Sequence, residues 1–230
     1  MRAHWIPELE IKEDYVISGD GLHHLAHVVR IETNEELLLL NGKGLQVLTE
    51  VISISKREMR LKFKNSEIET RKYEISLVLG MPKREALELT LKQAVELGFK
   101  QVFLIKSDYS QMKAPEDERL QNLLVSALEQ SNAGHMPEVR TASWESVPWS
   151  QFEEVLLLDS QTKNSPDSTQ KKYSGAYLMV VGPEGGFSPH ELNFLRQLKN
   201  VSPINLPTPI LRTPTAVSVG AGILLQRLLD

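Results

Sequence analysis

The sequence predicts an α/β protein in which a small β-rich domain precedes a larger domain with a largely parallel sheet. Two patterns predict this division. Up to about residue 70, short apolar runs alternate with turn signals. From residue 73 onward, strand-like apolar runs alternate with segments whose apolar residues recur every three or four positions. Strands that alternate with helices form parallel sheets covered on both faces. We therefore expect two domains, 1–70 and 73–230.

The first domain is expected to form a small β-barrel. The stretch "NGKG", residues 41–44, lies between two apolar runs and is typical of a hairpin connection. One helix interrupts the strands, because Leu22, Leu25 and Val29 fall on one helix face in "LHHLAHVVRI". Two histidines of that helix are four residues apart, but the Glu of the zinc motif H-E-x-x-H is missing, so we expect no metal site.

The second domain begins with a βαβ unit. Residues 74–80 and 100–106 are apolar runs typical of buried strands, and the helical pattern of residues 84–98 between them ends at Gly98, a common C-cap residue. The polar segment 159–175 has no apolar period and is expected to be a surface excursion. The other expected elements are a helix at 115–132, strands at 153–159 and 175–182, a helix at 188–199, a strand at 201–206 and a helix at 214–229.

Composition excludes several classes of protein. The chain has 230 residues, 41% of them apolar, which suffices for a globular core. It has no cysteine, which excludes a disulfide framework and thiolate sites and fits a reducing interior. The start of the chain lacks an apolar signal segment, and no run approaches the roughly 18 apolar residues of a membrane span. We therefore expect a cytoplasmic protein without a membrane span.

Charge gives two opposed indications about nucleic acids. The formal net charge of −4 argues against a nucleic-acid-binding protein. However, the strand pattern in "KREMRLKFK" places Arg60, Lys62 and Lys64 on one face. That face is either a phosphate-contacting patch or an ordinary solvated strand face. Together with Arg30, these three residues are the RNA-binding candidates.

A glycine-rich loop, "GPEGG", follows the strand expected at 175–182. In open α/β sheets, ligands bind beyond the carboxyl ends of the strands. Gly182, Gly185 and Gly186 lack a Cβ, so the backbone can approach a ligand and offer its N–H groups. The spacing fits neither the Rossmann fingerprint nor the P-loop. The alternative interpretation is a tight structural turn.

Both loops at this edge lead into helices with clear start signals. Ser188 and Glu191 form a capping box, and Thr213 followed by Pro214 marks the last helix as N-cap and first turn. Small side chains cover part of the surface of the last helix, which permits either close helix packing or the approach of a flat ligand. These small residues are Ala216, Gly220, Ala221 and Gly222.

Two motifs together resemble the SPOUT-class methyltransferases that modify uridine N3 in small-subunit (16S) ribosomal RNA. They are "GPEGGFSPHE" and "LPTPILRTPTA", preceded by "LKQAVELG" and "LEQS". The early "HHLAHVVR" resembles that family's PUA-like barrel. The resemblance covers nearly the whole chain and implies a trefoil knot in 73–230, an exception to the rule that chains do not thread loops. It also implies a homodimer that binds S-adenosylmethionine and acts on the ribosomal RNA of the small subunit.

The resemblance implies that the two loops hold the cofactor and that no metal is needed. The sulfonium already carries a good leaving group, so the protein aligns the reactants and excludes water. Arg212 is the catalytic candidate, because a cation favours the deprotonated uridine. The implied cofactor-binding residues are Leu158, Gly182, Glu184, Gly185, Gly186, Leu206, Leu211, Arg212, Thr213 and Ala216.

The chain departs from the family pattern on the substrate side. Pro214 stands where the family usually has a carboxylate, and Ala133 and Tyr109 stand where it usually has arginines. His135 is a candidate to replace some of the lost charge. We therefore expect an S-adenosylmethionine-dependent methyltransferase of uridine N3 in 16S ribosomal RNA. The alternative is a divergent RNA- or ribosome-binding protein of the same fold that has lost its activity or changed its RNA target.

Overall fold

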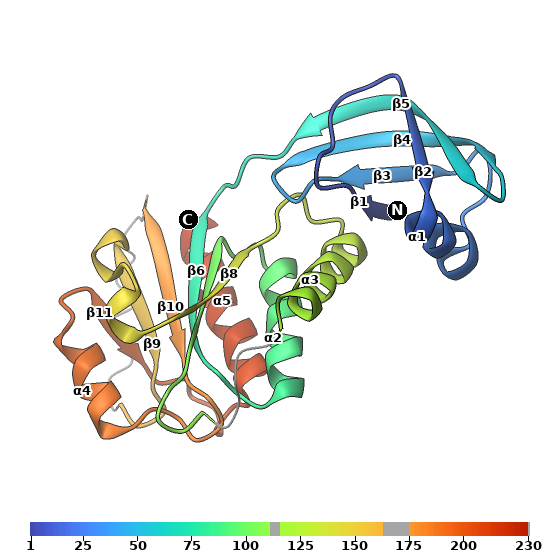
Figure 1. Ribbon diagram of the computed structural model, residues 1–230. Coiled ribbons are helices and arrows are strands. Elements are labelled where there is room, and N and C mark those ends of the chain that lie inside the picture. The colour runs from blue at the N-terminus through green and yellow to red at the C-terminus, as the bar shows by residue number, and fades with distance from the viewer. Residues whose placement is uncertain (111–115, 163–174, 230) are drawn as a thin grey trace. The chain divides into compact units, whose positions relative to one another are not determined.

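The computed structural model describes residues 1–110, 116–162 and 175–229 (Figure 1). The chain forms two compact units, which are described separately. Residues 1–71 and 125–136 make up the first unit, and residues 72–124 and 137–230 make up the second. Helix α3 (Asp117–Ser131) therefore begins in the second unit and ends in the first. This return of the chain to the first unit has no counterpart in the apolar pattern of the sequence.

The first unit contains a five-stranded sheet in the order β1-β3-β4-β5-β2. β1 pairs with β3 in parallel, and the other pairs are antiparallel. The predicted hairpin connection at 41–44 is confirmed, because it joins β3 to β4, with φ of 71° at Gly42 and 104° at Gly44. The strands are β1 (Arg2–Trp5), β2 (Asp14–Ser18), β3 (Glu36–Leu40), β4 (Leu45–Ile54) and β5 (Glu58–Ile68).

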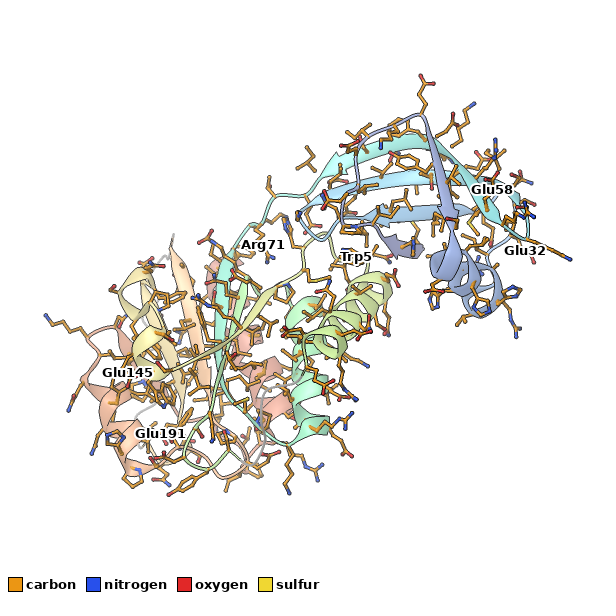
Figure 2. All side chains as sticks on the ribbon, viewed as in Figure 1. Trp5, Glu32, Glu58, Arg71, Glu145 and Glu191 are labelled. Atoms are coloured by element: carbon orange, nitrogen blue, oxygen red, sulfur yellow. The ribbon has the colours of Figure 1, made fainter. Side chains whose placement is uncertain are left out.

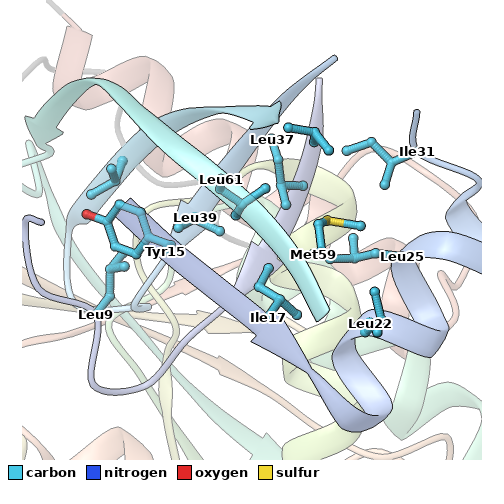
Figure 3. Close-up of a cluster of buried hydrophobic side chains, with 12 residues drawn as sticks. Leu9, Tyr15, Ile17, Leu22, Leu25, Ile31, Leu37, Leu39, Met59 and Leu61 are labelled. Atoms are coloured by element: carbon cyan, nitrogen blue, oxygen red, sulfur yellow. The ribbon is translucent and has the colours of Figure 1, made fainter. Parts of the chain in front are cut away.

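The sheet curls around an apolar core (Figure 3). Alternate residues of β5, such as Met59 and Leu61, point into this core, and the predicted helix closes it. That helix begins earlier than expected, as α1 (Gly19–His23), and continues as a π-helix over His24–Val29. Its apolar face is as predicted, since Leu22 and Leu25 are buried and Val29 packs against the core.

The end of α3 and the residues after it complete the first unit. The Glu129 carboxylate accepts hydrogen bonds from the backbone N–H of Trp5 at 2.8 Å and from the His4 ring at 3.2 Å. Two backbone hydrogen bonds, from Met136 to Gly42 and from Gly44 to Gly134, bind the following loop to the hairpin connection. Segments more than 80 residues apart in the sequence are thus held together because their polar groups satisfy one another.

The second unit contains a six-stranded sheet in the order β11-β9-β10-β6-β7-β8, and every pair is parallel. The predicted parallel sheet is confirmed. The edge strand β8 is missing from the expected elements, because its exposed polar residues show no apolar run. The strands are β6 (Glu74–Gly80), β7 (Gln101–Ile105), β8 (Glu138–Ala142), β9 (Glu154–Leu158), β10 (Ala176–Val181) and β11 (Val201–Ile204).

Helices cover both faces of this sheet (Figure 1). α2 (Arg84–Glu96) and α5 (Thr213–Leu229) contact each other on one face, where α5 also contacts β10. α4 (Pro189–Gln197) packs its apolar residues on the other face, together with Trp149 from a short 3-10 helix. Most of the predicted excursion, 163–174, lies outside the described residues. Within the described part of the chain, no helix is long and apolar enough to cross a membrane.

Two of the predicted signals at helix ends are confirmed. The Ser188 and Glu191 side chains form the predicted capping box at the start of α4. At the end of α2, Gly98 has φ of 72° and the backbone N–H of Phe99 bonds to the carbonyl of Ala94, as in a Schellman cap. The capping box thus fixes the start of α4, and the glycine cap fixes the end of α2.

The lowered pKa of the Glu129 carboxyl predicts that the stability of the first unit depends on pH. Burial raises the pKa of its carboxyl, but hydrogen bonds from His4 and Trp5 outweigh burial and hold that pKa below the usual 4.5. A lowered pKa stabilises the fold above the usual value, and this stabilisation is lost as the pH falls through the folded value. We expect Glu129→Gln to flatten the loss of unfolding free energy between about pH 6 and about pH 3, measured by urea unfolding.

The matched control is Glu8→Gln, which changes an exposed carboxyl of the same unit. It should leave the acid limb of the pH profile unchanged. Equal acid limbs for wild type and Glu129→Gln would contradict the role assigned to the buried carboxylate.

Close packing of α5 gives a second prediction. A Cβ on Gly220 would collide with the Met179 sulfur and approach Leu158 Cδ1 to 3.0 Å, whereas a Cβ on Gly222 would meet nothing within 4 Å. Gly220→Ala should lower the free energy of unfolding by about 1–3 kcal/mol through overpacking. Gly222→Ala should raise it by about 0.5–1 kcal/mol, since Ala is the better helix former. Urea unfolding of both variants checks the pair, and equal effects would contradict it.

Candidate active site

A pocket of about 290 Å³ lies where β9, β10 and β11 end. These three strands are neighbours in the sheet, and they are parallel, so their carboxyl ends meet at one edge. The walls come from the strand ends and the loops that follow them, with residues 158–161 from β9, 181–187 from β10, and 204–206, 208–211 and 213 from β11. The position is the one expected for the ligand site of an open α/β sheet.

The glycine loop is folded back tightly on its own backbone. The N–H of Gly186 bonds to the carbonyl of Pro183 at 2.8 Å, and Gly186 has φ of 71°. A Cβ on Gly182 would lie 3.3 Å from the backbone of Gly186, and a Cβ on Gly80 would lie 2.6 Å from Pro183 Cδ. Larger residues at these positions would separate the segments. The glycines are therefore needed for the tight turn, and they also leave the backbone of the loop free of side chains.

Glu184 connects the glycine loop to the start of α2. Both of its carboxylate oxygens lie within hydrogen-bonding distance of the backbone N–H of Lys83, at 3.1 and 3.3 Å. A carboxylate is favourable there because the first N–H groups of a helix have no partner within the helix. The Glu184 side chain thus organises the loop.

A hydrogen bond joins the loops that follow β10 and β11. The hydroxyl of Thr213 donates to the carbonyl of Gly182 at 3.1 Å. The backbone N–H of Ala216 bonds to the carbonyl of Arg212, so α5 begins at Thr213 and Arg212 precedes it as the N-cap residue. The predicted start was one residue later. The Thr213 side chain instead binds across the pocket and holds two distant segments together.

The pocket brings together all of the predicted cofactor-binding residues except Arg212. Arg212 is exposed and is absent from the lining, although Leu211 and Thr213 on either side of it contribute to the wall. The sequence-based reasoning missed residues 159–161, which follow β9. Their signal was available, because they come directly after an apolar run, as the glycine loop does.

Asp159 is one of the missed residues, and its charge is compensated inside the wall. The side chain is buried, with 7% of its surface exposed. Its carboxylate accepts hydrogen bonds from Arg196 of α4 at 2.8 Å and from the backbone N–H of Gln161 at 2.9 Å. A buried carboxylate needs such partners to offset its lost hydration. The pair fixes the loop after β9 against α4.

The basic face predicted on β5 exists, but its charges are partly paired. Arg60 forms an ion pair with Glu58 at 2.7 Å, and Lys64 forms one with Glu36 at 2.6 Å. The hydrogen bond that Lys64 donates to Glu36 raises the pKa of Lys64. Lys62 lies opposite Asp14 in the register of β2 and β5.

The remaining predicted positions lie elsewhere in the first unit. Arg30 is exposed and has φ of 56°, just after the π-helix. The His135 ring bonds through Nε2 to the carbonyl of Glu69 at 2.8 Å, so that nitrogen carries a proton and serves the structure of the loop. The rings of His23 and His27 are 4.8 Å apart. Among the described residues, no three His, Cys, Asp or Glu side chains form a group that could hold a metal ion.

Comparison with known families defines the class of this protein. A family model described as "RNA methyltransferase domain" matches residues 69–225, and one described as "RNA methyltransferase PUA domain" matches residues 17–64. The first match spans more than half of the chain. The chain therefore belongs to the RNA methyltransferase family that this model describes.

Similar proteins carry a more specific name than the family model does. The ribosomal RNA small subunit methyltransferase E of Aquifex aeolicus is 28% identical over 224 residues, which cover 94% of this chain and 96% of that protein. The enzyme of the same name from Rickettsia conorii is 26% identical over 204 residues, or 86% and 84% of the two chains. The crystal structure of the Neisseria gonorrhoeae methyltransferase of this name, bound to S-adenosyl methionine, has a TM-score of 0.85 at 22% identity and covers 98% of this chain and 97% of its own. This likeness confirms the predicted fold class.

The bond between Thr213 and Gly182 gives a prediction for the pocket. Thr213→Val keeps the shape of the side chain but removes the donor, and the Gly182 carbonyl loses a partner. We expect the free energy of unfolding to fall by about 1–2 kcal/mol. Thr215→Val, an exposed change two residues on, is the matched control and should have little effect. Equal unfolding midpoints for the two variants in urea would contradict a role for this bond.

Proposed function

We propose that this protein is an S-adenosylmethionine-dependent methyltransferase that modifies N3 of a uridine in small-subunit ribosomal RNA. The observation that carries the proposal is the meeting of two loops, 182–187 and 205–213, in one pocket at the carboxyl ends of three neighbouring strands. The small-subunit methyltransferase names of the relatives, and the bound S-adenosyl methionine of the Neisseria gonorrhoeae protein, support it.

The residues of the pocket fit this cofactor. The glycine loop offers a bare backbone edge, which suits hydrogen bonds to a purine and a ribose. Apolar side chains flank that edge and suit the face of an adenine ring. The residues that would hold the cofactor by this proposal are Leu158, Gly182, Glu184, Gly185, Gly186, Leu206, Leu211, Thr213 and Ala216.

The cofactor would supply a methyl group on a positively charged sulfur. The chain's part is to align the acceptor nitrogen with that methyl group and to exclude water. N3 of uridine carries a weakly acidic proton, so a nearby cation favours its loss. Arg212 is exposed beside the pocket, between the lining residues Leu211 and Thr213, and is the cation proposed for this role.

The partners proposed for the protein are ribosomal RNA and a second copy of the chain. The exposed side chains of Arg60, Lys62 and Lys64 on β5, and that of Arg30, would contact phosphates. A phosphate would replace Glu58 or Glu36 as the partner of its cation, and exposed ion pairs of this kind cost little to break. The homodimer and a cytoplasmic location follow from the resemblance to SPOUT methyltransferases, and light scattering at micromolar concentration tests the dimer.

The decisive experiment combines binding with analysis of the RNA. Titration calorimetry measures S-adenosylmethionine binding to the purified protein. Nucleoside mass spectrometry then compares 16S ribosomal RNA from wild type, from a strain lacking the gene and from the complemented strain. We expect one N3-methyluridine to disappear and return. An unchanged nucleoside profile would contradict the proposal and favour the divergent RNA-binding alternative, and loss of another methylated nucleoside would reveal a changed target.

Arg212 provides a test of how the reaction is catalysed. Arg212→Ala should lower kcat by about 100-fold, the order found when one stabilising donor is lost, while the Kd for S-adenosylmethionine changes by less than about threefold. Arg212→Lys retains the charge and should recover part of kcat. Equal losses in kcat and in cofactor affinity would assign Arg212 to cofactor binding alone.

A further inference from the structure

A second pocket adjoins the glycine loop at Glu184 and Gly185. Its volume is about 640 Å³, and it shares Glu184 and Gly185 with the pocket already described. A methyl acceptor must reach the donor to within roughly 3 Å, so it must enter beside a wall that both pockets share. The second pocket meets that requirement. Its lining residues are Lys83, Asp108, Tyr109, Ser110, Glu184 and Gly185.

Tyr109 is the aromatic residue of this lining, and it remains exposed. Of its surface, 48% is accessible, although most large apolar side chains of the second unit are buried. Its Cβ packs directly on Gly185, where an added Cβ would come within 3.0 Å. The glycine thus lets the aromatic residue stand against the shared wall with 48% of its surface accessible.

The segment that carries Tyr109 is held on both sides. The backbone N–H of Ser110 bonds to the carbonyl of Ser107 at 2.9 Å, which closes a turn around residue 109. The backbone N–H of Asp108 bonds to the buried Glu191 carboxylate at 3.0 Å, and the Asp108 carboxylate accepts from the Ser188 hydroxyl at 2.5 Å. A residue whose neighbours are fixed in this way loses less conformational entropy when a ligand binds.

The charge of the lining selects which part of a nucleotide would enter. Among the described lining residues, two carboxylates, Asp108 and Glu184, outnumber the one ammonium group, that of Lys83. An excess of negative charge disfavours a phosphate, so the uncharged base is the better occupant. An exposed aromatic face suits a base that has left its stack, because base stacking on aromatic rings tolerates any sequence.

We infer that Tyr109 is a substrate-positioning residue whose ring stacks on the target base in the second pocket, next to the cofactor pocket. This inference rests on the proposed function, because it requires a methyl acceptor that is an RNA base. The ring would contribute affinity and alignment, whereas the identity of the base would be read by other groups.

The experiment compares two substitutions of similar size. Tyr109→Phe keeps the aromatic face, and Tyr109→Leu removes it but retains an apolar side chain. The substrate is small ribosomal subunits from a strain that lacks the gene, and methyl transfer is followed as a function of subunit concentration. We expect Tyr109→Leu to lower kcat/KM for the subunit by about 10- to 100-fold, the range typical of a lost base stack. Tyr109→Phe should stay within about threefold of wild type.

Two measurements separate this role from a structural one. The Kd for S-adenosylmethionine and the thermal unfolding midpoint should be the same in wild type and both variants, since the ring neither lines the first pocket nor lies in the core. An active wild type with Tyr109→Leu equal to Tyr109→Phe would overturn the stacking role and leave the proposed function intact. Loss of cofactor binding or folding in Tyr109→Leu together with its activity would also overturn it. A wild-type protein without methyl transfer would overturn both proposals.

Discussion

The parallel pairing of β11, β9 and β10 is the constraint on which the site depends. Because the three strands run in the same direction, the chain leaves each of them at the same edge of the sheet. Beyond the strand ends, backbone groups no longer have ladder partners and are available to other groups. The hydrogen bond from Thr213 to Gly182 then converts the loops after β10 and β11 into one wall.

Three carboxylates hold this edge together, of which Asp159 and Glu191 are buried and Glu184 is exposed. Glu184 binds the glycine loop to the start of α2, Asp159 binds the loop after β9 to Arg196 of α4, and Glu191 binds α4 to the loop after β7. Glu191 also accepts a hydrogen bond from the ring nitrogen of Trp144 at 3.3 Å. A charged group in the interior is tolerated because several donors replace its hydration. The hydrogen bonds that offset the cost of burying these charges also fix the geometry of the loops.

Charge is distributed differently in the first unit. Its cations on β5 lie at the surface, where Arg60 pairs with Glu58 of the same strand and Lys64 pairs with Glu36 of β3. Pairs of this kind contribute little to stability, and water and salt exchange with them readily. On the proposed function, such a face serves an RNA whose phosphates compete for the cations, and its affinity depends on the concentration of salt. An overall charge of −4 is compatible with this arrangement because the field near a phosphate is local.

Most of the second unit follows from local chemistry. The βαβ order, the capping box at Ser188 and the cap at Gly98 depend on residues within one or two turns of each other, so the sequence alone determines them. The glycine loop and the loop before α5 were recognisable for the same reason. The polar edge strand β8 was not, since an edge strand with exposed side chains lacks the apolar run that marks buried strands.

Other features were decided by tertiary structure alone. Glu129 meets His4 across 125 residues of sequence, and Glu184 meets Lys83 across 101. The contact of Tyr109 with Gly185, and the pairing of Lys64 with Glu36, likewise depend on how the strands and loops pack. Local patterns of hydrophobicity record which face of an element is buried. They do not record which distant polar group will satisfy a carboxylate or which surface an exposed ring will face, because those partners are chosen only when the elements pack.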